Sequence, residues 1–146
     1  MPAITPMPDS ATCPCRVLSA DESGGRRSYA NCCKPLHAAG FAGLGTTPEA
    51  TMRSRYTAYV LRDEAYLLAT WHETTRPPSI DFSTDVDWHG LTVKSATGAS
   101  LDNAGAVEFT ARFRRGDAHL ELHELSTFSQ ENGRWFYVDG TDPDTL

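Results

Sequence analysis

Four cysteines in two close pairs are the residues of this chain best suited to chemistry. Cys13 and Cys15 form a C-x-C pair, Cys32 and Cys33 are adjacent, and the chain holds 4 cysteines in all. Gly24-Gly25 allows the chain to turn back between the two pairs. Structural zinc takes four ligands in a tetrahedron, and four thiolates supply such a set. The spacing therefore predicts one structural zinc site that leaves no position for water or substrate.

Three other uses of the cysteines stay open at this point. A disulfide is one, although reduced thiols are the rule in the cytosol. A redox dithiol is another, but its usual spacing is C-x-x-C rather than C-x-C or C-C. If Cys32 and Cys33 do not both bind the metal, His37 is the candidate for the fourth ligand.

Composition limits the classes of protein that fit. The chain has 146 residues, enough for a single domain with its own core. Its net charge is −6, from 13 basic and 19 acidic residues, which disfavours a broad nucleic-acid-binding surface; Arg26-Arg27 is the one candidate for a basic spot. No apolar run approaches the roughly 18 residues of a membrane span, and the first residues lack a secretory signal pattern. We expect a cytoplasmic protein with no membrane association.

The helical patterns all lie before Trp88. Thr47 is suited to an N-cap and Pro48 to the first helical position, so we expect a helix from there to about Arg62. Met52 and Tyr56 belong to its apolar stripe. A second helix is expected over 63–70 with Asp63 as its N-cap, and one helical turn near 29–31. The segment 34–46 reads as a connecting loop, and a short helical turn is expected near 82–85.

From Trp88 onward the apolar residues alternate with a period of two, which indicates strands. Gly116-Asp117 and Asn132-Gly133 are hairpin turn signals. Four strands joined by short turns predict an antiparallel meander with one face packed on the helices. The expected strands are 88–96, 106–115, 118–129 and 134–139.

Glu124 breaks the pattern of the third strand. It shares a face with Leu120, Leu122 and Phe128, and an ionised carboxylate among apolar residues needs a partner. Arg53, at the edge of the apolar helix stripe, is the expected partner, with Arg55 as the second candidate. Two interpretations follow: a structural ion pair, or the polar floor of a ligand pocket. The pocket candidates are Arg53, Arg55, Tyr56, His72 and Glu124.

The cysteine segment resembles the SEC-C motif, a zinc knuckle also found at the C-terminus of the SecA translocation ATPase. The resemblance is carried by Cys13-Pro14-Cys15, Ser23-Gly24-Gly25, Tyr29 and Cys32-Cys33. This chain departs from the usual motif by about eight extra residues after Cys15. The resemblance implies a zinc ion and suggests a protein partner that docks on the knuckle.

Most of the remaining chain resembles the YchJ family of uncharacterised bacterial proteins. The matching stretches are Thr47-Pro48-Glu49-Ala50, 52–59, Thr70-Trp71-His72, 109–113, 123–128 and 135–140. The resemblance implies an α+β, nuclear-transport-factor-2-like fold, a cone of curved four-stranded antiparallel sheet with helices packed on it. It implies no reaction, because the family has no established activity.

These observations give one main hypothesis and one alternative. The main hypothesis is a zinc-binding adaptor with a flexible tail over 1–12, a knuckle over 13–37 and a nuclear-transport-factor-2-like domain over 47–142. The alternative is a small-molecule enzyme of isomerase or hydrolase type, with a polar pocket around Glu124 and Arg53.

Overall fold

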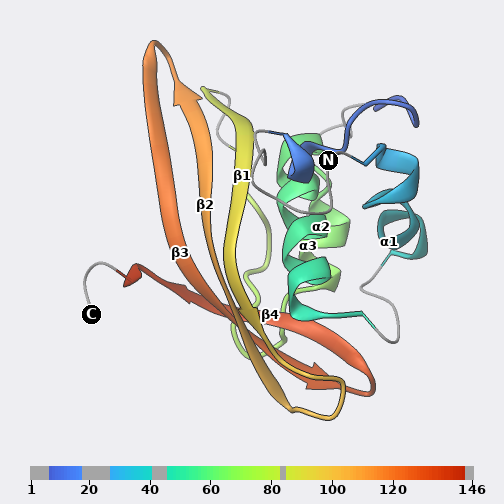
Figure 1. Cartoon of the computed structure of the whole chain (residues 1–146). Helices are drawn as coiled ribbons and strands as arrows, with labels where there is room; N and C mark the ends of the chain where they lie inside the picture. Colours follow the sequence, from blue (N-terminus) through green and yellow to red (C-terminus); the bar gives the residue numbers. More distant parts are fainter. Residues whose placement is uncertain (1–6, 18–26, 41–45, 83–84, 144–146) are drawn as a thin grey trace.

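A curved sheet wraps around two helices in the computed structural model of the chain (Figure 1). The structure describes residues 7–17, 27–40, 46–82 and 85–143. The helices lie on the concave side of the sheet, and the segment 34–39 lies against them on the side away from it (Figure 1). The segment 14–17 contacts the sheet as well, where the backbone N–H of Leu91 donates to the carbonyl oxygen of Val17. This arrangement confirms the α+β, cone-shaped fold expected from the sequence.

The sheet is an antiparallel meander of four strands in the order β1-β2-β3-β4. Register shifts interrupt the pairing in β1 and between β3 and β4, and such bulges bend and twist the strands they occur in. The two expected hairpin turns are present, with positive φ at Gly116, Asn132 and Gly133. The strands are β1 (Val86–Thr97), β2 (Ala104–Arg115), β3 (Ala118–Glu131) and β4 (Arg134–Thr141).

The two expected helices form where the caps predict them. Helix α2 (Pro48–Leu61) begins at Thr47, whose hydroxyl accepts a hydrogen bond of 3.1 Å from the backbone N–H of Ala50. Helix α3 (Glu64–Ala69) begins at Asp63, whose carboxylate accepts from the backbone N–H of Tyr66. These caps satisfy backbone donors that would otherwise be orphaned at the helix starts.

Helix α2 is buried around nearly its whole circumference, which is unusual for a helix with two arginines in its middle. The sheet covers one side, where Met52 and Tyr56 join a core cluster with Leu91, Val107 and Trp135. The cysteine segment and α1 cover another side. The buried residues of α2 are Pro48, Thr51, Met52, Arg53, Ser54, Arg55, Tyr56, Thr57, Ala58 and Leu61.

The segment expected to be a loop after the cysteines contains a short helix, α1 (Lys34–Ala39). Pro35 fits the first turn, and Gly40 ends the helix in the left-handed conformation with φ 81°. The prediction of a loop over 34–39 was therefore wrong: it rested on the alanines and glycines from Ala38 onward, and the segment has no apolar periodicity that would indicate a helix. The turn expected at 29–31 is present as the 3-10 helix Tyr29–Asn31. The turn expected near 82–85 falls partly on residues outside the described ranges.

The end of the sheet near the β2–β3 turn extends past the helices (Figure 1). Leu120 and Leu122 lie on this end and are 40% and 38% exposed. The sequence predicted both to be buried with Phe128, which is 2% exposed. The prediction was wrong for the two leucines because the helices cover this face of β3 only in part: Leu120 lies toward the uncovered end, and Leu122 lines the cavity described below.

Residues 7–12 are the described part of the expected tail, and they contact the cysteine segment. Thr12 pairs with Ser28 in an isolated β-bridge, and Lys34 forms an ion pair of 2.6 Å with Asp9. Residues 1–6 lie outside the described ranges. Among the described helices, none has both the length and the apolar character needed to cross a bilayer.

Candidate functional site

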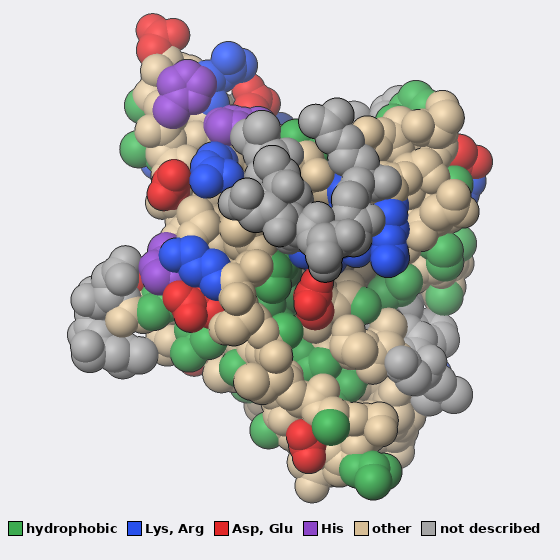
Figure 2. Space-filling model, viewed as in Figure 1, with side chains coloured by type: hydrophobic (Ala, Val, Ile, Leu, Met, Phe, Trp, Pro, Cys, Tyr) green, Lys and Arg blue, Asp and Glu red, His purple; other side chains and the backbone are tan. Residues whose placement is uncertain are grey.

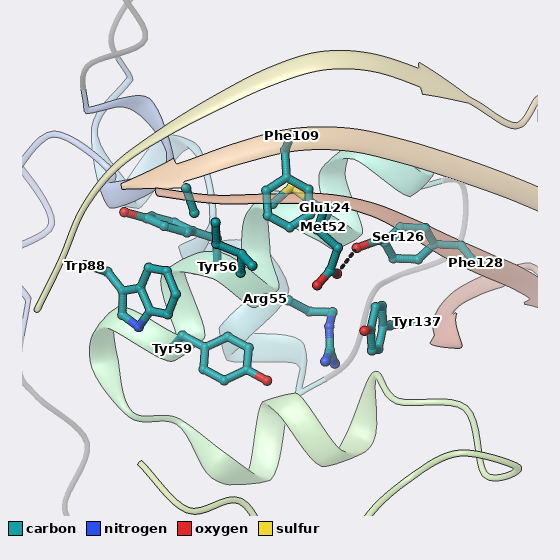
Figure 3. Close-up of a pocket in the computed structure, with 12 residues that line it drawn as sticks. Met52, Arg55, Tyr56, Tyr59, Trp88, Phe109, Glu124, Ser126, Phe128 and Tyr137 are labelled. Atoms are coloured by element: carbon teal, nitrogen blue, oxygen red, sulfur yellow. Dashed lines mark hydrogen bonds between the residues drawn. The ribbon is translucent and has the colours of Figure 1, made fainter. Parts of the chain in front are cut away.

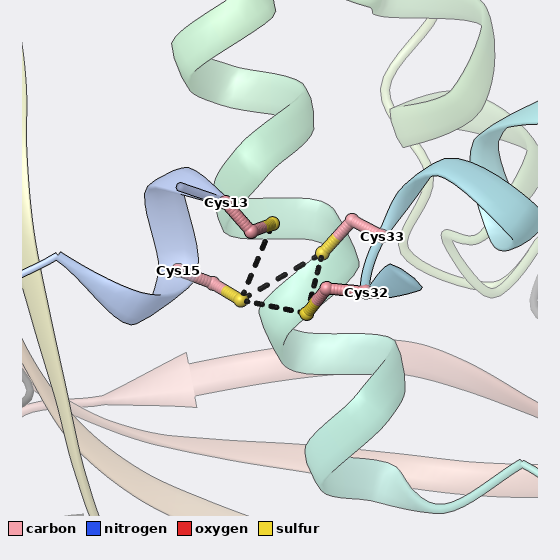
Figure 4. A group of neighbouring side chains, drawn as sticks. All are labelled: Cys13, Cys15, Cys32 and Cys33. Carbon is pink, nitrogen blue, oxygen red and sulfur yellow. Dashed lines mark hydrogen bonds between the residues drawn. The ribbon is translucent and has the colours of Figure 1, made fainter. Parts of the chain in front are cut away.

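The four cysteine sulfurs meet in one cluster beside helix α2 (Figure 4). The Sγ of Cys15 lies 3.7 Å from that of Cys13, 3.5 Å from that of Cys32 and 3.7 Å from that of Cys33. The Cys32 and Cys33 sulfurs are 4.0 Å apart, and all four atoms lie within 4.8 Å of one another. Both cysteine pairs therefore supply both of their sulfurs to one point in space.

These separations fit metal ligands and exclude disulfides. A disulfide requires about 2.05 Å between sulfurs, whereas all four thiols here are free. Four sulfurs placed about 2.3 Å from a central zinc ion in a tetrahedron lie about 3.8 Å from one another. The sulfur positions of this chain match that spacing, so the cluster could hold a metal ion.

Hydrogen bonds among the four thiols lower the pKa of Cys13 and Cys32 and raise the pKa of Cys15 and Cys33. Hydrogen bonds from Cys13 and the other two thiols lower the pKa of Cys32, and a hydrogen bond from Arg16 adds to this effect. The hydroxyl of Thr57, on α2, lies 3.6 Å from the Sγ of Cys13. The guanidinium of Arg53 donates a hydrogen bond of 2.7 Å to the carbonyl oxygen of Cys15.

His37 has a different task from the one considered in the sequence. Its Nε2 lies 2.8 Å from the carbonyl oxygen of Ser54, and its Nδ1 lies 2.8 Å from the hydroxyl of Tyr29. Since a carbonyl only accepts, Nε2 carries the proton and Nδ1 accepts from Tyr29. Burial lowers the pKa of His37, which favours this neutral form. Both ring nitrogens are thus engaged away from the sulfurs, and His37 joins the cysteine segment to α2.

A cavity of about 250 Å³ lies between α2 and the concave face of the sheet (Figure 3). Six aromatic rings and three aliphatic side chains form most of its wall, together with one cation, one carboxylate and one hydroxyl. The lining residues are Met52, Arg55, Tyr56, Tyr59, Trp88, Phe109, Ala111, Leu122, Glu124, Ser126, Phe128 and Tyr137.

Arg55 supplies the cation of this cavity. Its Nη1 donates to the carbonyl oxygen of Leu67 at 2.8 Å and to the hydroxyl of Thr70 at 2.7 Å. The guanidinium carbon lies 4.9 Å from the ring centre of Trp71 and 4.5 Å from that of Tyr137. Burial lowers the pKa of Arg55, although an arginine keeps its charge under such conditions.

Glu124 supplies the carboxylate. Its Oε2 accepts a hydrogen bond of 2.6 Å from Ser126, two residues further along the same face of β3 (Figure 3). Gly140, on β4, lies against this carboxylate so closely that a Cβ there would overlap its carbon atom. The negative charge of Glu124 acts on Arg55 across the cavity and opposes the lowering of the Arg55 pKa by burial. No ion pair within 4.0 Å joins the two side chains in the described structure.

The partner expected for Glu124 needs correction. Arg53 does not line the cavity. It points toward the cysteine segment and forms an ion pair of 2.9 Å with Glu49. Residues two apart on a helix point in nearly opposite directions. The sequence assigned the cavity side of α2 to Arg53, but Arg55 occupies it.

Of the other pocket candidates, Tyr56 lines the cavity and His72 does not. The backbone N–H of His72 donates to the carbonyl oxygen of Tyr137, which ties the end of α3 to β4. Its Nε2 lies 2.9 Å from a carboxylate oxygen of Glu131. Sequence reasoning missed Ser126 and Tyr137 as cavity residues, although the alternation along β3 places Ser126 on the same face as Glu124.

Charged side chains of both signs are interspersed over the face shown in Figure 2. Of the candidate basic spot, Arg27 is described and Arg26 lies outside the described ranges. The absence of nucleic-acid binding stays a prediction.

Comparison with known proteins relates most of the chain to one family. Residues 47–140 match the family model described as the middle, NTF2-like domain of YchJ. A UPF0225 protein of Bordetella parapertussis is 42% identical over 136 residues, which are 92% of this chain and 96% of the relative. A UPF0225 protein of a Polaromonas species is 46% identical over 132 residues, 89% of this chain and 92% of the relative.

Two solved structures share the fold. The solution structure of a SEC-C motif containing protein from Rhodopseudomonas palustris is 33% identical, has a TM-score of 0.73 and covers 90% of this chain and 98% of its own. The crystal structure of a SEC-C motif containing protein from Psychrobacter arcticus is 30% identical, also with a TM-score of 0.73, and covers 90% and 82% of the two chains. Together with the cysteine cluster and the wrapped sheet, these matches show that the chain belongs to the YchJ family of UPF0225 proteins.

Proposed function

We propose that this chain binds one zinc ion through Cys13, Cys15, Cys32 and Cys33, and that the ion is structural. The observation that carries the proposal is the set of sulfur separations, 3.5–4.0 Å between the closest pairs, near the 3.8 Å or so of a zinc tetrathiolate. A complete set of four protein ligands leaves no open position for a substrate. The resemblance to the SEC-C zinc knuckle agrees with the same metal.

The charge around the cluster supports this proposal. A zinc ion with four thiolates carries a net charge of −2, which is costly in a buried place without counter-charges. Cys13 and Cys15 are fully buried. Arg16 bonds to the side chain of Cys32, and Arg53 bonds to the backbone of Cys15. Two arginines beside the cluster reduce the cost of its negative charge, although Arg53 also forms an ion pair with Glu49.

The structural role follows from where the cluster sits. Cys13, Cys15 and Cys33 belong to the same buried cluster as Met52 and Tyr56 of α2. Metal binding at such sites typically contributes on the order of 10 kcal/mol of folding free energy. The ion would therefore add to the contacts with Ser54, Arg53 and Thr57 that hold the described part of the N-terminal segment on α2.

Metal analysis of the purified protein tests the proposal directly. We expect one equivalent of zinc per chain, and a cobalt-substituted form with the absorption of a tetrahedral tetrathiolate. Cys33→Ser should lower the stoichiometry and the melting temperature together. Ser95→Cys, an added thiol on an exposed strand position, should change neither.

Less than half an equivalent of zinc, with all four thiols titrating as free, would contradict the proposal. A cobalt spectrum of three sulfurs and one nitrogen would contradict the four-cysteine ligand set.

The expected protein partner of the knuckle, like a cytoplasmic location, stays a prediction of the sequence. The enzyme alternative was expected to use Glu124 together with Arg53, and it gains no support from the geometry, since Arg53 is not among the residues that line the cavity.

A further inference from the structure

We propose that the cavity between α2 and the sheet is a binding site for a small, neutral, flat aromatic molecule that carries an amide-like group. This group would accept from Arg55 and donate to Glu124. No cysteine lines this site, and the cysteine cluster contacts α2 at Arg53 and Thr57 instead. The proposal therefore does not depend on the identity of the metal.

The wall of the cavity selects for an aromatic ring. Tyr59, Trp88 and Tyr137 frame the open space, with Phe109 and Phe128 above it (Figure 3). Aromatic rings pair favourably in stacked or edge-on arrangements, beyond the gain from burying their area. A volume of about 250 Å³ is that of roughly eight liquid waters, which is suited to a one- or two-ring molecule.

Two opposite charges face the same space without touching. The guanidinium of Arg55 and the carboxylate of Glu124 both point into the cavity (Figure 3). Arg55 is only 5% exposed, yet it makes its hydrogen bonds to protein through Nη1 alone in the described structure. Its remaining N–H groups and the second carboxylate oxygen of Glu124 are thus available to a ligand.

Two further polar groups converge on this point. The hydroxyl of Tyr59 points toward the guanidinium, and Tyr137 packs its ring against it (Figure 3). Neither hydroxyl has a hydrogen-bond partner among the described residues. Half-buried tyrosine hydroxyls usually find one. Apolar walls with a few convergent polar groups are the general pattern of small-molecule sites.

The pair of charges decides the charge of the ligand. A carboxylate ligand would gain from Arg55 but would be repelled by Glu124, and a cationic ligand would meet the reverse. An amide has an acceptor oxygen and a donor nitrogen on one planar group, so it satisfies both side chains at once. The balanced charges therefore favour a neutral donor–acceptor group over either ion.

The test uses three probes of matching size: benzamide, benzoate and toluene. Each is titrated into the zinc-loaded, ¹⁵N-labelled protein, and binding is followed by amide and indole shifts. We expect benzamide to bind at least tenfold more tightly than benzoate, with shifts confined to residues that line the cavity. Toluene should bind more weakly than benzamide, because it leaves Arg55 and Glu124 without partners.

The variant Glu124→Gln should reverse the order of the affinities for benzamide and benzoate. The amide side chain has the shape of the carboxylate but no charge, so Arg55 becomes the only charge facing the ligand. Benzoate should then bind at least tenfold more tightly than it does to the wild type and overtake benzamide. Leu101→Ser, at a residue that is 94% exposed and distant from the cavity, serves as the control and should leave all affinities unchanged.

The proposal is overturned if 10 mM benzamide shifts no cavity residue. It is also overturned if the wild type prefers benzoate, or if toluene binds as well as benzamide. Because the ranking of the three probes is measured on the wild type, it stands even if Glu124→Gln does not fold.

Discussion

Replacing His37 with phenylalanine tests whether this histidine has a structural role or is a metal ligand. Phenylalanine keeps a ring to pack against Tyr66, whose ring centre lies 4.6 Å from that of His37. It removes both ring nitrogens, and with them the hydrogen bonds of 2.8 Å to Ser54 and to Tyr29. The change therefore deletes the polar connection between the cysteine segment and α2 while conserving most of the volume.

The expected cost follows from the two lost hydrogen bonds. Tyr29 is 8% exposed, so its hydroxyl would be left buried without a partner, at about 1–3 kcal/mol. The carbonyl of Ser54 keeps its bond within the helix and loses only a second one, at about 1 kcal/mol. The sum is about 2–4 kcal/mol, which corresponds to a fall in melting temperature of about 4–16 °C for a chain of this size.

The assay is urea unfolding at pH 7.5 with zinc at a fixed excess, together with metal analysis. Burial raises the pKa of Tyr29 to about 12, so its hydroxyl stays a donor throughout the measurement. Tyr29→Phe and the double variant complete a cycle, in which the double variant should cost less than the sum because both single changes remove the same hydrogen bond. His119→Phe, at an exposed site, is the matched control.

Zinc content decides the interpretation. His37→Phe should retain one equivalent of zinc, since all four sulfurs remain. Loss of the metal from this variant, with the cysteines intact, would show that the histidine is a ligand and would refute the reasoning. Unchanged stability would refute it as well, because it would mean that the two hydrogen bonds contribute nothing.

Three further predictions follow from individual contacts. Gly140→Ala should destabilise the fold by about 1–3 kcal/mol in thermal unfolding, because the added methyl overlaps the carboxylate of Glu124; adding Glu124→Ala should recover part of the loss, and no loss in the single variant would contradict the contact. Thr57→Val should weaken zinc retention against a chelator about tenfold, because it removes the hydroxyl beside a cluster sulfur; equal retention would show that this contact does not matter. Arg53→Lys should speed zinc release and leave the affinity for benzamide unchanged. Arg55→Lys should weaken benzamide binding and leave the rate of zinc release unchanged. The same effect from both variants would contradict the separate placement of the two arginines.

Local signals in the sequence predicted the elements of this fold well. The caps at Thr47 and Asp63 and the turn at Asn132-Gly133 act over a few residues, so their effect can be read without knowing the tertiary structure. The same is true of the cysteine cluster, because two short pairs supply all the sulfurs. The six-residue helix α1 was missed because it has no apolar periodicity and none of its residues is buried.

The sequence failed where a residue's surroundings come from distant segments. Alternation places Leu120, Leu122 and Glu124 on one face of β3, but only the length of α2 and α3 decides where the cover of that face ends. The first two residues are exposed for that reason. Glu124 pairs with Phe109 in the sheet and lies on the part of this face that α2 covers, so it lines the cavity.

Helix α2 explains both the success and the failure, because it is shared by two sites. A helix that faces solvent on one side shows its orientation through its polar residues. Here the cysteine segment covers one side and the sheet another, so Arg53 and Arg55 are both buried, at 4% and 5% exposure. Their polarity therefore carries no information about which one faces the sheet. What separates them is a rotation of about 200° over two residues, so that one serves the cysteine cluster and the other the cavity. Helix α2 therefore carries a buried positive charge on two of its sides. Only the packing of the cysteine segment and of the sheet against the helix reveals which arginine belongs to which site.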